Sequence, residues 1–331
     1  MNANLLEVRD LSVTFNTQRG PLHAVAGVSF DVRPGACVCI VGESGCGKSA
    51  TARSLLRLLP SADIGGQIAF RRHETDDPID IAQLDPNSAQ MRKIRGGGMA
   101  MVFQEPMTSF TPVYTIGQQI VEAVLAHRPE LGAAAREVAI DAVRKVGISD
   151  AARRVDDYPH QMSGGMRQRA MIAMALACQP AVLIADEPTT ALDVTIQSQV
   201  LRLLDDLQSD LDMGVILVTH DLAVVAAIAD DVVVMYLGKV VERAPVREFF
   251  DNPQHPYSQG LLASIVRADT PSKSLLPFIA GQVAADHGAA QGCRFANRCP
   301  HAHDRCAQEP PQREVRPGHV VACWLHLPVS P

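Results

Sequence analysis

A glycine-rich loop between an apolar run and a helical pattern constrains the fold of this chain more than any other feature. Residues 42–49 read Gly-Glu-Ser-Gly-Cys-Gly-Lys-Ser and fit the pattern G-x-x-x-x-G-K-[ST]. Residues 37–41 before the loop are continuously apolar, and residues 49–59 after it have helical spacing. A strand, a loop of this kind and a helix form a cradle of backbone N–H groups. The sequence therefore predicts a nucleotide-phosphate site at the end of a strand.

The side chains of this loop suit a nucleoside triphosphate bound with Mg²⁺. Lys48 is placed to reach the β- and γ-phosphates, and the Ser49 hydroxyl can ligate Mg²⁺. We expect ATP to contact the whole loop and the residue after it, which are Gly42, Glu43, Ser44, Gly45, Cys46, Gly47, Lys48, Ser49 and Ala50.

A second apolar run, residues 182–185, ends in the acidic pair Asp186 and Glu187. On its own this pattern would be an ordinary acidic turn after a strand. Beside a phosphate loop, the first carboxylate can hold Mg²⁺ through water and the second can polarise an attacking water. We therefore expect Asp186 to bind Mg²⁺ and Glu187 to act in hydrolysis.

Apolar periodicity predicts a mostly parallel sheet flanked by helices. Residues 11–15 and 28–32 alternate apolar with polar side chains, which indicates strands, with turns at residues 19–21 and 33–35. Further elements follow as buried-strand runs at residues 182–185, 215–219 and 232–236, and as helical patterns at residues 116–126, 133–146, 165–178 and 195–211.

Composition excludes two classes of protein. A net charge of −6 and a pI near 6.0 disfavour a nucleic-acid partner, which would need clustered Lys and Arg. Glu7, Arg9 and Asp10 stand where a signal peptide needs apolar residues. The most apolar region, residues 222–237, is interrupted by Asp230 and Asp231. We expect a globular, cytosolic-type enzyme that does not span a membrane by itself.

Residues 162–169, Met-Ser-Gly-Gly-Met-Arg-Gln-Arg, resemble the signature motif of ATP-binding cassette (ABC) ATPases. In that family the motif opens a helix that faces the γ-phosphate bound by a partner subunit. The resemblance implies a trans contact from Ser163, Gly164, Gly165 and Met166, with Ser163 and Gly165 as the main contacts.

Three further residues match the family's motifs in the family's order. The resemblance implies that Gln104, in the sequence Phe-Gln-Glu-Pro, lies near Mg²⁺ and the attacking water. It also implies that His220 points toward the γ-phosphate and that Asp193 lies at the dimer interface. Phe15 resembles the aromatic residue that stacks on adenine, although it also fits the apolar face of residues 11–15, and Arg19 is a second candidate.

The flanking sequences resemble the D-type ATPase subunits of dipeptide and oligopeptide transporters. Residues 102–109, Met166 in place of Gln at the end of the signature, and residues 255–262 carry this resemblance, which covers essentially the whole chain. The departures are small: Glu105, Phe110 and Met162 stand where the family more often has Asp, Leu and Leu.

This resemblance implies an ATPase that powers peptide import through ATP-driven closure of a nucleotide-binding dimer. The implied partners are a related F-type ATPase subunit, two transmembrane permease subunits and, indirectly, an extracytoplasmic substrate-binding protein. The implied location is the cytoplasmic face of the inner membrane, as a peripheral subunit that docks through residues 107–114 and 116–126. Nickel importers share these features, and a soluble cassette ATPase without a transport role is a further alternative.

Three regions are expected from these patterns. Residues 1–105 and 180–250 form an α/β nucleotide-binding core, which the resemblance identifies as a RecA-like parallel sheet with an antiparallel β subdomain. Residues 106–179 form a helical insertion with the signature, and residues 251–331 form a small Cys-rich extension.

Four cysteines gather in the C-terminal region, at Cys293, Cys299, Cys306 and Cys323. A reducing compartment disfavours disulfides, so metal coordination is the main functional interpretation. The absence of a C-x₂₋₄-C pair favours an iron–sulfur cluster over zinc, with unligated thiols as a third alternative. The family resemblance implies a [4Fe-4S] cluster, whose negative charge Arg294, Arg298 and Arg305 would partly offset.

Overall fold

The computed structural model of the chain describes residues 3–18, 20–105, 109–189, 193–265, 277–281 and 292–327. The chain divides into two compact units, which are described separately. The first unit comprises Met1–Leu6, Asp31–Ala36 and Ala69–Val218, and the second comprises Glu7–Phe30, Cys37–Ile68 and Thr219–Pro331. The three regions expected from the sequence have other boundaries than these two units, and they stay a prediction.

The second unit contains the N-terminal strands. β1 (Leu6–Thr17) lies between β2 (Gly20–Val32) and β4 (Ala62–Phe70) in one sheet. Leu11 and Val13 of β1 are buried and alternate with half-buried residues, which confirms the expected strand. The strand begins earlier than expected, and its buried positions change parity at Asp10, which has a φ of 48°. Because the alternation of buried and exposed residues shifts by one position there, the sequence pattern did not predict the part of β1 before Leu11.

The phosphate loop lies in the second unit between a buried strand and a helix. β3 (Cys37–Val41) pairs in parallel with β9 (Asp231–Tyr236), and both strands confirm the predicted runs to within one residue. α1 (Lys48–Ser54) follows the loop. It is shorter than the helical pattern predicted, because the chain turns after Ser54 and Arg57 adopts a left-handed φ of 54°.

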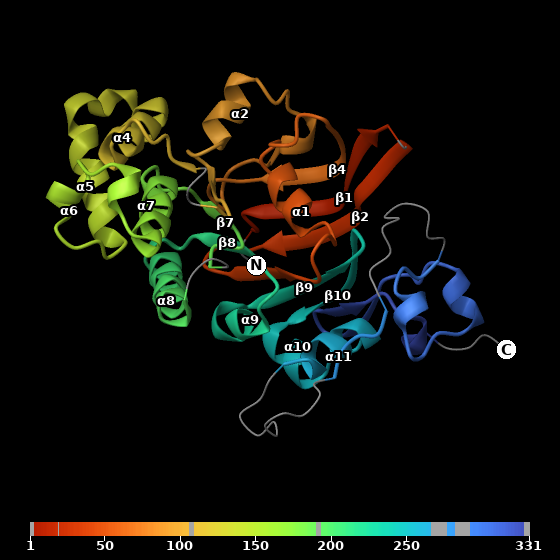
Figure 1. Cartoon of the computed structure of the whole chain (residues 1–331). Coiled ribbons are helices and arrows are strands. Elements are labelled where there is room, and N and C mark those ends of the chain that lie inside the picture. Colours follow the sequence, from red (N-terminus) through yellow and green to blue (C-terminus); the bar gives the residue numbers. More distant parts are fainter. Residues whose placement is uncertain are drawn as a thin grey trace. The chain divides into compact units, whose positions relative to one another are not determined.

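The C-terminal segment extends this sheet. β10 (Lys239–Pro245) pairs antiparallel with β9, β12 (His319–Val321) pairs antiparallel with β10, and β11 (Arg313–Arg316) pairs with β12. α9 (Leu222–Ile228), α10 (Val246–Asp251) and α11 (Pro256–Ala263) complete the unit (Figure 1). The Cys-rich segment is therefore joined to β10 by main-chain hydrogen bonds, whereas the sequence predicted an appended extension.

The first unit has a parallel sheet and a group of helices. β7 (Val182–Asp186) pairs in parallel with β6 (Met99–Val102) and with β8 (Gly214–Thr219). The structure confirms β7 and β8 as predicted, but β6 was not predicted because four residues are too few to show a period. β5 (Ile79–Asp80) pairs antiparallel with Ala69 and Phe70, the last two residues of β4, which belong to the first unit.

The four helical patterns predicted in the first unit each match a helix to within about two residues, whereas the short helices at residues 89–94 and 151–154 were not predicted. α4 (Ile116–His127) begins at a capping box in which Thr115 and Gln118 each bond the other's backbone. α4, α5, α6 and α7 contact one another as a group (Figure 1). The remaining helices are α2 (Ala89–Ile94), α5 (Ala135–Lys145), α6 (Ala151–Arg154), α7 (Gly164–Leu176) and α8 (Val194–Leu211).

Short 3₁₀ turns occur at Ile81–Gln83, Pro129–Ala134, Pro159–Gln161, Ala296–Arg298, Asp304–Ala307 and Trp324–His326. Within the described part of the chain, none of the helices combines the length and the apolar character needed to cross a bilayer.

Candidate functional site

Backbone geometry shows why the phosphate loop is rich in glycine. Gly42, Gly45 and Gly47 have φ values of 151°, 80° and 99°. A Cβ atom at Gly47 would lie 2.3 Å from the carbonyl oxygen of Ala24, and one at Gly42 would lie 2.2 Å from that of Met235. Two of these positions therefore exclude any side chain on both conformational and steric grounds.

Lys48 lies across the loop that it ends. Its Nζ donates hydrogen bonds to the carbonyl oxygens of Gly42, at 2.7 Å, and Glu43, at 3.0 Å, and the side chain is buried. Ser49 and Ala50 follow in the first turn of α1, where both are half-buried. Burial raises the pKa of the neighbouring Cys46 thiol. This thiol is 1% exposed and is held in its uncharged form, so it packs rather than reacts.

The backbone and side chain of Glu43 are both held by residues that the sequence did not single out. Its N–H donates to the Tyr257 hydroxyl at 2.8 Å, and its carboxylate pairs with the Arg298 guanidinium. Both partners come from the C-terminal part of the second unit. The residues lie more than 200 positions apart in sequence, so no local pattern could have predicted these contacts.

In the first unit, the structure brings together two of the three residues predicted to act in hydrolysis. Gln104 follows β6 and donates from Nε2 to Oε2 of Glu187 at 3.1 Å. Glu187 follows Asp186, which ends β7 and is fully buried. Glu187 has a φ of 48°, and its N–H donates to Val218 of β8 at 2.9 Å. The main chain therefore turns sharply after the strand, and this turn directs the glutamate toward the glutamine.

The signature residues open a helix, as the sequence predicted. Ser163 is the N-cap of α7, and its Oγ accepts a hydrogen bond from the N–H of Met166 at 3.3 Å. Asp193 is exposed and caps α8 in the same way, through Ile196 at 3.0 Å. Gly164 has open space around it, and a Cβ at Gly165 would lie 3.0 Å from Ile196. A helix N-terminus with open N–H groups suits a phosphate.

His220 and Phe15, both in the second unit, are the last residues assigned to the nucleotide. His220 directly follows β8 and is exposed. Phe15 is half-buried in β1, whereas Leu11 and Val13 on the same alternation are fully buried. The stacking role of Phe15 therefore stays a prediction, and Arg19, the second candidate, lies outside the described residues.

The four C-terminal cysteines line one small pocket. All four thiols are free, and His301, His303 and Trp324 share the lining. The N–H of Cys293 donates to the carbonyl of Cys306 at 2.9 Å. Burial is the main cause that raises the pKa of the Cys323 thiol to about 11, and the neighbouring Cys293, Cys299 and Cys306 contribute to that rise.

The cysteine pocket is the candidate site for a metal or a cluster. Its donor set is suitable in kind, because four thiols in one pocket suit soft-metal coordination. Within the described residues, however, no three or more His, Cys, Asp or Glu side chains are already arranged so as to hold a metal ion. Two of the arginines expected to offset a cluster's charge are engaged elsewhere: Arg294 donates to the carbonyl of Leu237, and Arg298 binds Glu43.

Comparisons with known proteins find relatives over nearly the whole length of the chain. Residues 25–190 match the family model "ABC transporter", and residues 241–306 match "Oligopeptide/dipeptide transporter, C-terminal region". The chain is 48% identical over 324 residues, 97% of its length and 94% of the relative's, to the probable peptide ABC transporter ATP-binding protein y4tR of Sinorhizobium fredii. It is 47% identical over 325 residues, with the same coverage, to the dipeptide transport ATP-binding protein DppD of Bacillus subtilis.

Solved structures give the same match at the level of the fold. A dimeric post-hydrolysis state of the ATP-binding cassette MJ0796, bound to ADP and Pi, superposes with a TM-score of 0.63 at 25% identity. The match covers 73% of this chain and 99% of that one. The structure of cbiO1 from Clostridium perfringens, part of the transporter complex cbiONQ, gives 0.62 at 28% identity and covers 76% and 92% of the two chains.

Proposed function

The chain belongs to the ABC transporter ATP-binding family, and on this premise we propose that it is the ATPase subunit that powers import of di- and oligopeptides. Similarity over nearly the full length to a dipeptide transport ATP-binding protein carries the proposal, since 97% of the chain aligns at 47% identity. The match of residues 241–306 to the C-terminal region of oligopeptide and dipeptide transporters supports the peptide class.

We assign ATP and Mg²⁺ to the residues predicted from the motifs. Residues 42–50 and Phe15 bind ATP, while Ser49, Asp186 and Gln104 serve Mg²⁺. Glu187, Gln104 and His220 act in hydrolysis. The hydrogen bond between Gln104 and Glu187 supports the pairing of these two in one role.

The proposal includes a dimer of two ATPase subunits. The signature residues Ser163, Gly164, Gly165 and Met166 close over a nucleotide held by the other subunit, with Asp193 at the interface. The helix N-terminus at Ser163 supports this role, and the solved cassette MJ0796 is dimeric. We propose that the second subunit is a related F-type ATPase and not a second copy of this chain. Met166 and the Cys-rich segment carry the resemblance to D-type subunits, and this resemblance implies an F-type partner.

The remaining partners are two permease subunits, reached from the cytoplasmic face of the inner membrane, and indirectly a binding protein. Part of the expected docking region, residues 107 and 108, lies outside the described residues. Val113 and Tyr114, in the described part, are 69% and 52% exposed. Exposed apolar side chains beside the glutamine segment support docking of a permease there.

The test is transport in reconstituted vesicles that contain this chain, its permeases, its partner ATPase and its binding protein. Dipeptide uptake that requires ATP and stops in a Lys48→Ala variant is the expected result. Uptake of Ni²⁺ without peptide would favour a nickel importer instead. ATP hydrolysis by the chain that no permease alters would favour a soluble cassette ATPase.

For the cysteine pocket, we propose a [4Fe-4S] cluster held by Cys293, Cys299, Cys306 and Cys323, with zinc as the alternative. The four-thiol donor set supports the proposal. Iron and acid-labile sulfide are measured on anaerobically purified protein, together with visible absorption. We expect iron and sulfide in the native protein, together with a visible absorption band that is lost in Cys299→Ser. Stoichiometric zinc without iron would favour the zinc site instead.

A further inference from the structure

Glu43, the second residue of the phosphate loop, is held by the far end of the chain. Arg298 binds its carboxylate through two parallel contacts, Nη1 to Oε2 at 2.5 Å and Nη2 to Oε1 at 3.0 Å. The Tyr257 hydroxyl accepts the Glu43 N–H at 2.8 Å. Two-pronged pairing of this kind fixes the direction of a carboxylate as well as its position.

The Arg298 guanidinium is itself fixed on every side. Its side chain is 5% exposed, and it donates to the carbonyls of Ile279 at 3.2 Å and Ala280 at 3.0 Å. It also donates to the Tyr236 hydroxyl at 3.3 Å and lies 5.9 Å from the centre of that ring. An arginine side chain carries its positive charge at every physiological pH.

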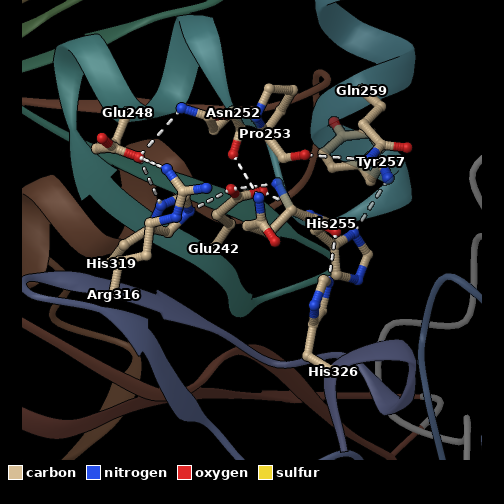
Figure 2. Close-up of polar contacts among 11 residues, drawn as sticks. Glu242, Glu248, Asn252, Pro253, His255, Tyr257, Gln259, Arg316, His319 and His326 are labelled. Atoms are coloured by element: carbon tan, nitrogen blue, oxygen red, sulfur yellow. Dashed lines mark hydrogen bonds and ion pairs between the residues drawn. The ribbon is translucent and has the colours of Figure 1, made fainter.

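The Tyr257 contact continues into a buried hydrogen-bond chain (Figure 2). The N–H of Tyr257 donates to Nδ1 of His255 at 3.1 Å, and the N–H of His255 donates to Glu242 at 2.8 Å. Glu242 in turn bonds His319 of β12 at 2.7 Å. Two groups of Glu43 are therefore bound to the C-terminal segment. Arg298 holds its carboxylate, and the series of hydrogen bonds that begins at Tyr257 holds its backbone N–H.

A carboxylate on a phosphate-binding loop opposes the ligand's charge. Phosphate oxygens and Glu43 are both negative, and in a partly buried site their repulsion is screened only weakly. We propose that Arg298 is a positioning residue for nucleotide binding: it cancels the charge of Glu43 and holds the loop in place, so that the C-terminal segment sets the loop's affinity for nucleoside di- and triphosphates. The inference rests on the proposed role of residues 42–50 in ATP binding.

The experiment measures, on the full chain and in the presence of Mg²⁺, the Kd of a fluorescent ADP analogue. We expect Arg298→Gln to weaken binding about tenfold, which is about 1.4 kcal/mol. The double variant Arg298→Gln with Glu43→Gln regains most of that loss, because the unpaired negative charge is gone. The matched control is Arg316→Gln, which breaks a more exposed ion pair of the same segment, to Glu248 at 2.8 Å, and leaves Kd unchanged.

Amide hydrogen exchange of residues 42–47 without nucleotide gives a second readout, and faster exchange in Arg298→Gln is expected. Unchanged Kd and unchanged exchange in that variant would overturn the inference, as would a double variant no better than the single one. If Arg298→Gln does not fold, Glu43→Gln alone decides, because it removes the negative charge and should bind the analogue at least as tightly as the native chain. Failure of the native chain to bind the analogue would instead remove the proposed function, while the exchange result would still test the tether.

Discussion

The Nε2 atom of Gln104 donates a hydrogen bond to Oε2 of Glu187, at 3.1 Å. The two residues follow neighbouring parallel strands, β6 and β7, and their side chains meet at the carboxyl ends of those strands. An amide that donates to a carboxylate oxygen restricts the rotation of the carboxylate. The hydrogen bond therefore joins Gln104 to the carboxylate that we propose to polarise water.

Replacing Glu187 by Gln should trap ATP and nearly stop its hydrolysis. The amide keeps the shape of the side chain but is a very weak base, so we expect a fall in kcat of about 10²–10⁴ with ATP affinity retained. Steady-state phosphate release by the assembled transporter is the measurement. Glu137→Gln, an exposed glutamate on α5, is the control and should hydrolyse ATP at the native rate. Undiminished turnover in Glu187→Gln would remove its assigned role.

Removing the partner amide should have a smaller effect. In Gln104→Ala the Glu187 carboxylate loses its hydrogen bond but keeps its position on the turn after β7, where its N–H bonds Val218. We expect kcat to fall about tenfold, because misorientation costs less than loss of the base. Single-turnover hydrolysis measures this step apart from binding. The exposed Gln83 supplies a Gln→Ala control, and a kcat for Gln104→Ala equal to that of the control would contradict the coupling.

Two glycines of the phosphate loop form a matched pair for testing its shape. Both Gly45 and Gly47 have positive φ, so alanine at either site should destabilise the loop conformation by about 1–2 kcal/mol. Only at Gly47 would the new Cβ also meet the carbonyl of Ala24, at 2.3 Å; at Gly45 it meets open space. We therefore expect Gly47→Ala to lose more stability and more nucleotide affinity than Gly45→Ala. Denaturant unfolding and ADP titration measure the two effects, and equal losses would contradict the steric argument.

The local patterns that predicted the fold share one property: the residues concerned are close in sequence. β3, β7, β8 and β9 are continuous apolar runs, and the structure confirms each of them within one residue. β12, by contrast, has only three residues and is a strand because β10 provides its hydrogen-bond partners. Nothing local to residues 319–321 could indicate that pairing.

The candidate site divides in the same way. The sequence located the phosphate loop, the acidic pair and the signature, because each is a contiguous motif. It missed Arg298 as a partner of Glu43, since 255 residues separate them. Arg298 was instead assigned to a cluster because of its cysteine neighbours, and the structure directs its guanidinium to the phosphate loop. Its role beside a cluster stays a prediction, whereas its contact with Glu43 could be found only from the structure.

The buried pair of Glu242 and His319 predicts a loss of stability in acid. Burial raises the pKa of Glu242, but hydrogen bonds from His319, Ser258 and two backbone N–H groups outweigh it and leave the pKa below its usual value of 4.5. Because folding lowers this pKa, the carboxylate contributes stability above the unfolded pKa. That contribution is lost as the pH falls through the folded value. Urea unfolding between pH 7 and pH 3 should therefore show a fall in unfolding free energy below about pH 4.5.

Glu242→Gln tests the assignment. At pH 7 the variant should be less stable by about 2–3 kcal/mol, because an amide supplies one acceptor oxygen where the carboxylate serves His319 and the N–H groups of Gln254 and His255. Its unfolding free energy should then lack the part of the acid loss that belongs to Glu242. Glu122→Gln, on the exposed side of α4, should keep the native stability and the native pH profile. A Glu242→Gln variant with the full native loss in acid would show that other carboxylates cause it.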